Sequence, residues 1–469
     1  MERKTAPFDT NSGGGMEVSR PTNMSARNTG LVLVLLGCAI LTGYCIYGLS
    51  GRAGWSFGDF KCVYSGARCM VLGCNPYNEN ELIQTYAAAG GDPSRWFAVR
   101  KYNAINLPTA LFLIIPFGVL PWETAKVLWM ILILGSFVVA ALLVWDLSRP
   151  YAPVVSGALI GVFVASSAML LRSANLAGLV IGLCAIAVWC FVTERFVTAG
   201  IVCLAISLVL KPHDSGLIWF WLLLAGAGYR KRAVQTLGLV IALSLPAVLW
   251  VSLMPASSHW ARDMHANLVG NLSHGNSGDP GPANSWASSL TNVQAAIGVI
   301  RDDPHIYDPV AYLIGGGLLL VWLVPTLKAG QSRARDFLAL ASISALSLLP
   351  VYHRQYDTRL LLLMFPAAAM LWAGGGLVGW LALLITAAAI ALTSAKLVAA
   401  STQLHIDSNG LSREILTIVL HRPIPLVVLI LCLFYLSIYV ARTNREKSLA
   451  GADDSRRPIG RIGISEATT

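Results

Sequence analysis

Charged residues are scarce in this sequence. Asp, Glu, Lys and Arg make up 12% of its 469 residues, whereas soluble domains carry about 25%. Hydrophobic residues make up 55% and the mean hydropathy is +0.63. Apolar runs of about 15 to 22 residues recur along most of the chain. This composition excludes a soluble protein and predicts an all-α protein that crosses a membrane many times.

The predicted membrane spans are nearly free of charge, and the sequence shows no convincing internal repeat. A secondary transporter or lipid flippase is the main alternative to an enzyme. Such a protein would carry charges at mid-membrane depth and often two similar halves. A non-catalytic membrane assembly protein is a third alternative. The long polar loops gather on one predicted face, which favours chemistry or recognition on that face.

A metal-binding pattern is also missing. Four histidines share the polar stretch at residues 255–309: His259, His265, His274 and His305. His259 and His265 are six residues apart, a poor spacing for one helix face, and no HExxH pattern is present. We therefore expect neither a metal nor another cofactor.

The nine cysteines do not form a zinc pattern either. Six of them lie in apolar runs, where a thiol behaves as a small hydrophobic group. The other three are Cys62, Cys69 and Cys74 in the first polar loop. This loop has no histidine, which disfavours zinc. If the loop faces an oxidising compartment, two of the three cysteines can form a disulfide, and the sequence does not select the pair.

Basic residues set the expected orientation of the chain in the membrane. The net charge of +10 comes mostly from short loops between spans and does not indicate nucleic-acid binding. Residues 1–28 are polar and are predicted to form a disordered cytoplasmic tail without a cleavable signal peptide. Residues 29–441 form the predicted membrane domain, and residues 442–469 form a second cytoplasmic tail. The expected external loops cover about residues 51–122, 255–309, 351–359 and 400–423.

We expect about twelve transmembrane helices, with both ends of the chain in the cytoplasm. The predicted spans are residues 30–49, 122–145, 154–170, 176–192, 197–210, 217–227, 240–254, 313–327, 337–349, 360–372, 377–398 and 424–440. The apolar run from Leu107 to Leu120 contains Pro108 and Pro116 and is followed by Pro121. Three prolines in so short a run predict a membrane-surface or re-entrant helix rather than a crossing.

The first external loop contains an isolated carboxylate. Asp59 lies ten residues beyond Leu49, among Trp55, Phe57 and Phe60. A carboxylate at this depth is partly desolvated and costly to keep without a reason. We interpret Asp59 as the catalytic base of a membrane enzyme. The alternatives are a solvated loop carboxylate and a helix cap.

Several short motifs, in a fixed order, give the chain a family resemblance. They are Gly58-Asp59-Phe60, Tyr64-Ser-Gly66-Ala67, Gly73-Cys-Asn75-Pro76-Tyr77, the proline-bounded run 107–121, Asn175-Leu-Ala-Gly178-Leu, the stretch from Ala199-Gly200 to Leu210-Lys211-Pro212, and residues 353–356. With these motifs the chain resembles the GT-C superfamily of lipid-linked-sugar glycosyltransferases, and most closely glycosyltransferase family 87. One motif departs from the family. Where members often have Gly-Gln-x-Asn, this chain has Arg172-Ser173-Ala174-Asn175, so only the asparagine carries over.

The resemblance implies a GT-C-like fold and an inverting hexosyltransferase that uses a polyprenyl-phosphate-linked sugar. The expected sugar is mannose, with arabinose or glucose as alternatives, and the acceptor is a lipid or glycan. The lipid phosphate is a good leaving group, so no general acid is needed. The acceptor hydroxyl needs a base, which we assign to Asp59. The implied location is a bacterial plasma (inner) membrane with an extracytoplasmic active site.

Negative charge on the donor phosphate requires cationic or hydrogen-bonding partners. The expected donor or substrate contacts are Tyr64, Tyr77, Arg172, Asn175, Lys211, His353 and Arg354, with Arg359 as a further external cation. Each has a structural alternative. Lys211 stands at a helix end and can snorkel to the interface, His353 and Arg354 can belong to a plain interfacial turn, and Asp357 can pair with Arg359.

Overall fold

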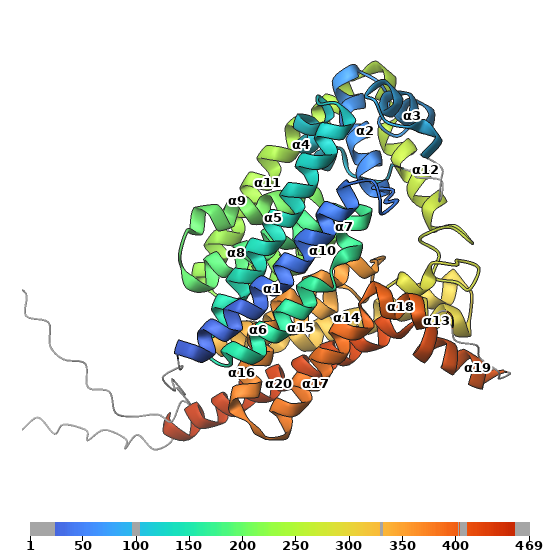
Figure 1. Ribbon diagram of the computed structural model, residues 1–469. Coiled ribbons are helices and arrows are strands. Elements are labelled where there is room, and N and C mark those ends of the chain that lie inside the picture. Colours follow the sequence, from blue (N-terminus) through green and yellow to red (C-terminus); the bar gives the residue numbers. More distant parts are fainter. Residues whose placement is uncertain (1–23, 96–103, 329–331, 402, 404–409, 455–469) are drawn as a thin grey trace, which may run out of the picture.

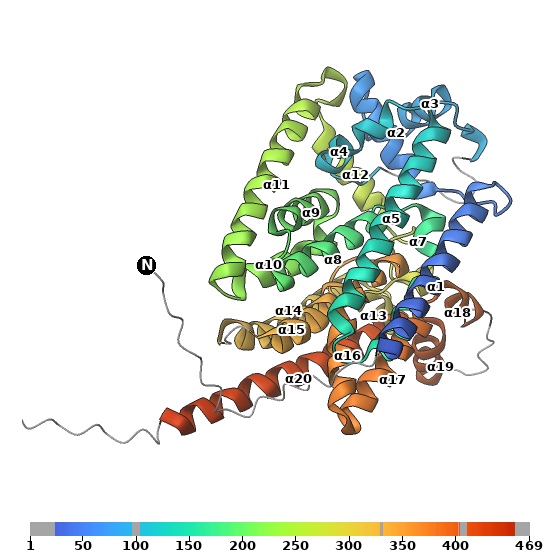
Figure 2. The same ribbon diagram turned by 60° about the vertical axis from the view of Figure 1, so that its left-hand side comes forward.

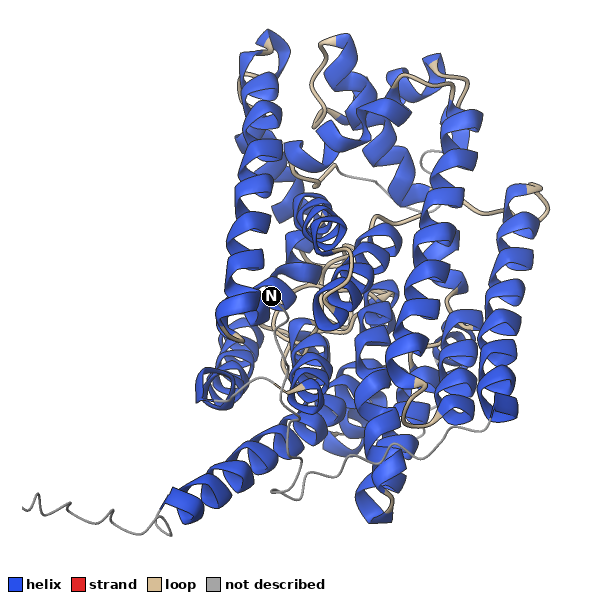
Figure 3. Cartoon of the chain, turned by 90° about the vertical axis from the view of Figure 1, so that its left-hand side faces the viewer, coloured by secondary structure: helices blue, strands red, loops and turns tan. Residues whose placement is uncertain are grey.

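The computed structural model describes residues 24–95, 104–328, 332–401, 403 and 410–454. Helices and the loops between them make up this part of the chain (Figure 3). The only paired extended segments within it are those of an isolated antiparallel bridge between Leu290 and Arg354. The prediction of an all-α protein is therefore confirmed.

Six helical segments of the described chain are long and apolar enough to cross a membrane. They are Met24–Leu49, Trp122–Ser148, Pro153–Ser173, Gly228–Leu253, Pro304–Leu327 and Pro423–Arg445. The first two are the helices α1 and α5, and the third comprises α6 (Pro153–Ala165) and α7 (Ala168–Ser173). The last three lie in α11 (Ala227–Leu253), α14 (Pro304–Lys328) and α20 (Pro423–Asp454). Their length and composition identify an integral membrane protein.

The other six predicted spans correspond to shorter helices. These are α8 (Ala177–Thr193), α9 (Val197–Leu210), α10 (Pro212–Leu224), α15 (Arg333–Ser347), α16 (Phe365–Gly374) and α17 (Gly376–Leu392). A transmembrane helix needs about 20 residues when it crosses a bilayer directly. The expected number of about twelve spans is therefore not confirmed and stays a prediction. The proline-rich run predicted as a surface or re-entrant helix forms α4 (Pro108–Gly118).

Further short helices lie between the long ones. They are α2 (Gly58–Leu72), α3 (Glu79–Ala88), η1 (Pro93–Arg95), η2 (Pro255–Ser257), α12 (Trp260–Leu272), η3 (Ala287–Ser289), α13 (Gln294–Ile300), η4 (Gln355–Met364), α18 (Ala395–Ser401), α19 (Leu411–Leu416) and η5 (Thr417–His421). In Figure 1, α2, α3, α4 and α12 gather at one end of the molecule, away from α16, α17 and α20.

Close helix packing holds the described chain together. A Cβ atom added to Gly37 in α1 would lie 2.2 Å from the carbonyl oxygen of Gly161 in α6. Such small residues let two helix backbones touch, which is a common basis of helix association in membranes. α8 is buried over almost its whole length and packs between α5 and α9. Figure 2 shows α8, α9 and α10 between α11 on one side and α5 on the other.

Helical structure extends into both segments that were predicted to be tails. α1 begins at Met24 and α20 continues to Asp454. Residues 1–23 and 455–469 lie outside the described residues, and so does most of the disorder predicted for the two ends of the chain.

Candidate functional site

Asp59 is the second residue of α2 and is part-buried. The N-terminus of a helix favours a negative charge through the helix dipole. Phe57, just before the helix, has a φ of 48°, a left-handed conformation that is rare for a bulky residue. Phe60 stacks on Trp129 of α5 with 4.9 Å between the ring centroids. These contacts hold the carboxylate in a defined position.

Asn175 lies directly beside Asp59. Its Nδ2 donates a hydrogen bond of 2.9 Å to Asp59 Oδ2, and its Oδ1 accepts one of 2.8 Å from the backbone N–H of Ala177. Ala174, the preceding residue, has a φ of 52°, and its carbonyl oxygen accepts a hydrogen bond from Trp129 Nε1. Backbone strain of this kind gathers at functional sites. Both Asp59 and Asn175 therefore follow closely on a strained residue.

The charge state of Asp59 depends on opposing effects. Burial raises the pKa of this carboxyl group above its usual value, while the Asn175 hydrogen bond and the positive charges of Arg354 and Lys211 act in the opposite direction. The negative charge of Asp357 adds to the rise. The net result is a raised pKa, which makes Asp59 a stronger base than an exposed aspartate.

Lys211 acts on Asp59 through its charge and contacts two further carboxylates. It lies between α9 and α10, and its Nζ contacts Asp214 Oδ2 at 3.0 Å and also Asp357 Oδ1. The ammonium group lies 5.5 Å from the ring centroid of Tyr356. Burial acts to lower the pKa of Lys211, but the two carboxylates outweigh it and raise the pKa. Lys211 is therefore positively charged at neutral pH.

Arg354 joins the polar loop after α12 to this site. Its Nη2 donates to the carbonyl oxygen of Ser277 at 2.8 Å, and its Nε donates to the hydroxyl of Tyr352 at 2.6 Å. Its backbone N–H donates to Asp357 Oδ2 at 2.8 Å, and this bond caps the first turn of η4. The guanidinium is part-buried. Asp357 therefore connects the side chain of Lys211 to the backbone of Arg354.

His353 is fully buried and contacts Asp214, the carboxylate that also contacts Lys211. Its Nε2 lies 3.2 Å from Asp214 Oδ1, and its Nδ1 lies 3.1 Å from the carbonyl oxygen of Val351. The ring of His213 packs edge-on against it at 5.0 Å. The backbone N–H of Thr291 donates to the His353 carbonyl oxygen. His353 thus joins α10 to the loop before η4.

The other predicted contacts lie differently. Tyr64 donates a hydrogen bond to the carbonyl oxygen of Leu120, and Tyr77 donates one to that of Asn106. Both tyrosines are buried and pack the segment between α1 and α5. Arg172 is exposed at the end of α7. The structure therefore brings Asp59, Asn175, Lys211, His353 and Arg354 together and leaves Tyr64, Tyr77 and Arg172 at its margins.

Arg359 does not pair with Asp357, contrary to the alternative drawn from the sequence. Its guanidinium is buried against the Phe163 ring at 4.6 Å and donates to the carbonyl oxygen of Thr393 at 2.6 Å. Further hydrogen bonds reach the hydroxyls of Ser166 and Ser167. Burial lowers the pKa of Arg359 to about 9. This residue connects helices and does not face Asp59.

Three residues of the site were not recognised from the sequence: His213, Asp214 and Asp357. In the run Lys211-Pro-His-Asp214 at the end of a predicted span, only Lys211 was identified as a candidate contact. A lysine followed three residues later by an aspartate at a helix N-terminus could have indicated an ion pair. No local signal relates Asp357 to Lys211, which is 146 residues away.

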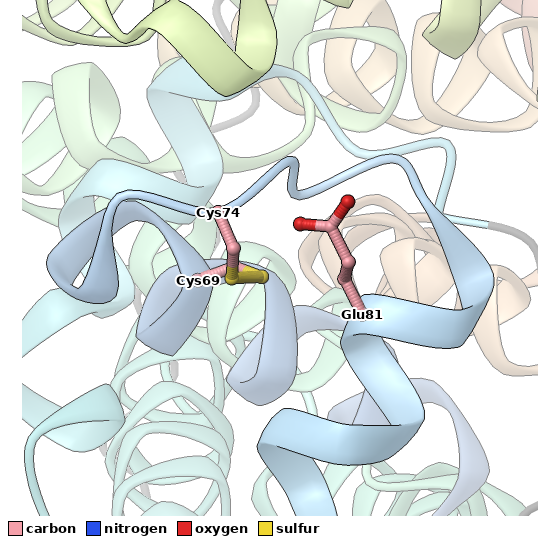
Figure 4. A group of neighbouring side chains, drawn as sticks. All are labelled: Cys69, Cys74 and Glu81. Atoms are coloured by element: carbon pink, nitrogen blue, oxygen red, sulfur yellow. A yellow bond between two sulfur atoms is a disulfide. The ribbon is translucent and has the colours of Figure 1, made fainter.

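A disulfide closes the far end of α2. It joins Cys69 to Cys74, whereas Cys62 is a buried free thiol. Figure 4 shows the carboxylate of Glu81 beside the two sulfur atoms. Because both sulfurs are in the disulfide, they do not offer thiolates to a metal. Glu81 instead accepts a hydrogen bond of 2.8 Å from the backbone N–H of Asn75.

An apolar cavity of about 390 Å³ lies next to His213. Its walls come from α10, α14 and α15, with Leu217, Leu319 and Leu346 among the lining side chains. The cavity is partly open to the outside of the molecule. It therefore provides an apolar surface a short distance along the chain from Lys211.

Comparison with known proteins adds one match. The family model described as "Glycosyltransferase family 87" matches residues 105–351, which is more than half of the chain. The matched segment contains Asn175, Lys211 and Asp214, while Asp59 and Arg354 lie outside it. No curated protein and no solved structure matches the chain.

Proposed function

This chain belongs to glycosyltransferase family 87, and we propose that it transfers a hexose from a polyprenyl-phosphate-linked donor to a lipid or glycan acceptor. The family and the six long apolar helices make it an integral membrane glycosyltransferase. The proposal adds mannose as the first sugar to test and an inverting mechanism. We also propose that the protein lies in a bacterial plasma membrane, with its active site on the extracytoplasmic face.

The observation that carries this proposal is the position of Asp59. Its carboxylate has one oxygen fixed by Asn175, has a raised pKa, and lies within the electrostatic reach of Arg354 and Lys211. A base and two cations in one site fit a reaction in which a hydroxyl loses a proton while a phosphate gains negative charge.

The proposed reaction is a single displacement. The acceptor hydroxyl oxygen bonds to the anomeric carbon of the donor sugar while the bond from that carbon to the phosphate oxygen breaks. Asp59 takes the hydroxyl proton, and the polyprenyl phosphate leaves with the bonding electron pair. Attack from the face opposite the phosphate inverts the anomeric configuration.

We assign the donor phosphate to Lys211 and Arg354, the two cations whose positive charges lower the pKa of Asp59. Arg354 suits this role because its guanidinium can contact two phosphate oxygens at once. In this proposal His353 orients Lys211 through Asp214, because its buried ring contacts one carboxylate oxygen of Asp214 and Lys211 contacts the other. Arg172, Tyr64 and Tyr77 stay predictions from the family resemblance.

The prenyl chain of the donor fits the apolar cavity beside His213. The lining of this cavity is almost entirely apolar, so it favours a hydrocarbon chain. Pro212 and His213 line the cavity and follow Lys211 directly in the chain. A lipid with its phosphate at Lys211 can therefore place its tail against α10, α14 and α15.

Sugar transfer by the purified protein tests the proposal. The protein in nanodiscs is given radiolabelled polyprenyl-phosphate-mannose and a membrane lipid extract as the acceptor pool. Wild type is compared with Asp59→Asn and with Glu123→Gln, a matched carboxylate-to-amide change at an exposed position. We expect product from wild type and Glu123→Gln, and a loss of roughly 100-fold or more in Asp59→Asn.

The same experiment separates the rival functions. Equal transfer by Asp59→Asn and wild type removes Asp59 from the chemistry. A transporter or flippase would form no product. Reconstituted in liposomes of the same lipids, it would instead move the labelled donor across the membrane. If no transfer occurs with mannose, arabinose and glucose donors follow under the same conditions, and failure with all three overturns the proposed donor class.

A further inference from the structure

We propose that His213, Asp214 and His353 form a binding site for one divalent transition-metal cation, with zinc as the best-fitting ion. The three side chains offer two imidazole nitrogens and one carboxylate oxygen, a donor set that zinc commonly uses. The sequence did not indicate this site, because two ligands are adjacent in the chain and the third lies 139 residues beyond Asp214.

The geometry of the three donor atoms fits a small metal ion. Asp214 Oδ1 lies 3.2 Å from His353 Nε2 and 3.7 Å from His213 Nε2, and all three ligand atoms lie within 4.8 Å of one another. Tetrahedral zinc with bonds of about 2.0 to 2.1 Å places neighbouring ligand atoms about 3.3 Å apart. A modest movement of the exposed His213 ring completes three corners of this tetrahedron.

The hydrogen-bonding of His353 independently indicates a cation. Its Nδ1 faces the Val351 carbonyl oxygen at 3.1 Å, which places the ring proton on Nδ1. The lone pair of Nε2 then faces Asp214 Oδ1 at 3.2 Å. Neither atom has another hydrogen-bond partner within the described chain, and both side chains are at most 1% exposed. Their contact becomes favourable only with a proton on Nε2 or with a cation between the two atoms. Two buried acceptors that face one another are costly, and a cation between them removes the conflict.

This arrangement also matches the usual surroundings of a metal-binding histidine. Such a histidine donates its other ring N–H to a carbonyl or carboxylate, which fixes the tautomer and the ring orientation. Val351 provides the carbonyl for His353. Lys211 contacts the other carboxylate oxygen of Asp214, Oδ2, and so leaves Oδ1 for the metal.

The charge balance of the site gives the cation a consequence for function, a step that rests on the proposed transferase activity. Among the described residues, three carboxylates (Asp59, Asp214 and Asp357) face two basic side chains, Lys211 and Arg354. With neutral histidines this group carries a net negative charge and repels a lipid phosphate. A divalent cation reverses the sign. Its open fourth position would take a water molecule or a phosphate oxygen.

A second histidine-containing cluster lacks the feature that indicates a cation in the first, namely buried acceptor atoms without hydrogen-bond donors. His274, Asp279 and Asp302 also gather in space. However, the two oxygens of Asp279 already accept hydrogen bonds from the backbone N–H groups of Gly275 and Gly281, and His274 is 72% exposed. No buried acceptor there lacks a partner, so nothing in that cluster requires a cation.

The test measures metal in the full chain without sugar donor. The protein is purified in detergent with an affinity tag that contains no histidine, is dialysed, and is analysed by mass spectrometry of the elements. We expect about one zinc per wild-type chain. His213→Ala should lose it, because removal of a ligand weakens binding by more than the ~10- to 100-fold that loss of a supporting hydrogen bond costs. His265→Ala, an exposed histidine in α12, is the matched control and should keep the metal.

Cobalt substitution gives a second readout that does not depend on the metal present during expression. Apo protein titrated with Co²⁺ should develop the visible absorption of a tetrahedral nitrogen–oxygen site. Asp214→Asn and His213→Ala should lose this absorption, and His265→Ala should keep it. Thermal unfolding curves of each variant establish that the chain is folded.

The outcomes separate this inference from the proposed transferase function. Wild-type protein that holds no zinc and shows no cobalt absorption overturns the metal site, and a proton on His353 then resolves the buried conflict instead. Equal metal in wild type and His213→Ala overturns it as well. Neither result bears on sugar transfer, which is measured separately, and a metal-bound chain that transfers no sugar would leave this site standing.

Discussion

The side-chain amide of Asn175 donates a hydrogen bond of 2.9 Å to the carboxylate of Asp59, across 116 residues of chain. The other end of the same amide accepts a hydrogen bond from the Ala177 backbone, so the amide cannot turn over without losing both bonds. Asn175 therefore stabilises the charged form of Asp59. This contact links the start of α2 to the break between α7 and α8.

Asn175→Ala should shift the pH dependence of transfer. Because the hydrogen bond lowers the pKa of Asp59, its loss raises that pKa further, and a base must be deprotonated to act. We expect the acidic limb of the kcat/KM profile to move to higher pH. Profiles of Asn175→Ala and of the exposed control Asn276→Ala check this. An unshifted limb in Asn175→Ala would mean that another group sets the profile.

The sequence predicted the class of fold but not the number of crossings. Hydropathy does not distinguish a 14-residue apolar helix such as α9 from a membrane span, because both are continuous apolar runs. The part of the chain that the structure describes contains six helices that meet the length requirement and several that do not. The expectation of about twelve spans rested on counting both kinds.

The site was predictable only in part, for a similar reason. Asp59 was identified from its position among aromatic residues near the predicted membrane surface, and Asn175 through the family resemblance, but no spacing in the sequence places the two together. Pairing of Asp357 with Arg359, two residues away, was the structural alternative drawn from the sequence. In the 3-10 helix η4, with 3.0 residues per turn, such neighbours point in different directions, so Asp357 contacts Lys211 instead. Sequence separation carries no information about that pair.

Lys211→Met should destabilise the protein and weaken donor binding. Its side chain is only 13% exposed, and removal of one partner from a buried ion pair costs about 3 to 5 kcal/mol. Thermal unfolding in detergent measures this loss. The KM for the lipid donor should rise, because the phosphate loses one of its two proposed cations.

The double variant Lys211→Met/Asp357→Asn separates these two effects. It removes one of the uncompensated carboxylates, so part of the lost stability should return. Donor binding should stay weak, since the amide does not replace the ammonium group. Recovery of the wild-type KM in the double variant would show that Lys211 acts on the donor only through Asp357.

Asp59→Asn should stabilise the folded protein near neutral pH. The pKa of Asp59 is raised in the folded state, so the folded protein favours the protonated carboxyl. Below the pKa of the unfolded chain both states are protonated and no penalty exists. As the pH rises through the folded-state pKa, the penalty reaches its full value.

An asparagine cannot ionise and escapes this penalty. The unfolding midpoint of Asp59→Asn should therefore exceed that of wild type at neutral pH, and the difference should shrink below about pH 4, the usual aspartate pKa. Glu123→Gln, at an exposed carboxylate, should show no such trend. A pH-independent difference between Asp59→Asn and wild type would remove ionisation of Asp59 as its cause.

Reduction of the Cys69–Cys74 disulfide should lower the stability of α2 and of the loop that follows it. A disulfide that closes so short a loop contributes about 2 kcal/mol by constraining the unfolded chain. Dithiothreitol should therefore lower the unfolding midpoint of wild type. Cys69→Ser/Cys74→Ser should unfold at the reduced wild-type midpoint with or without reductant.

Cys62→Ala, which removes a buried free thiol near Asp59, should keep its response to dithiothreitol, because the disulfide remains. If the double serine variant still responds to reductant, another pair of cysteines forms a disulfide in the membrane-bound protein.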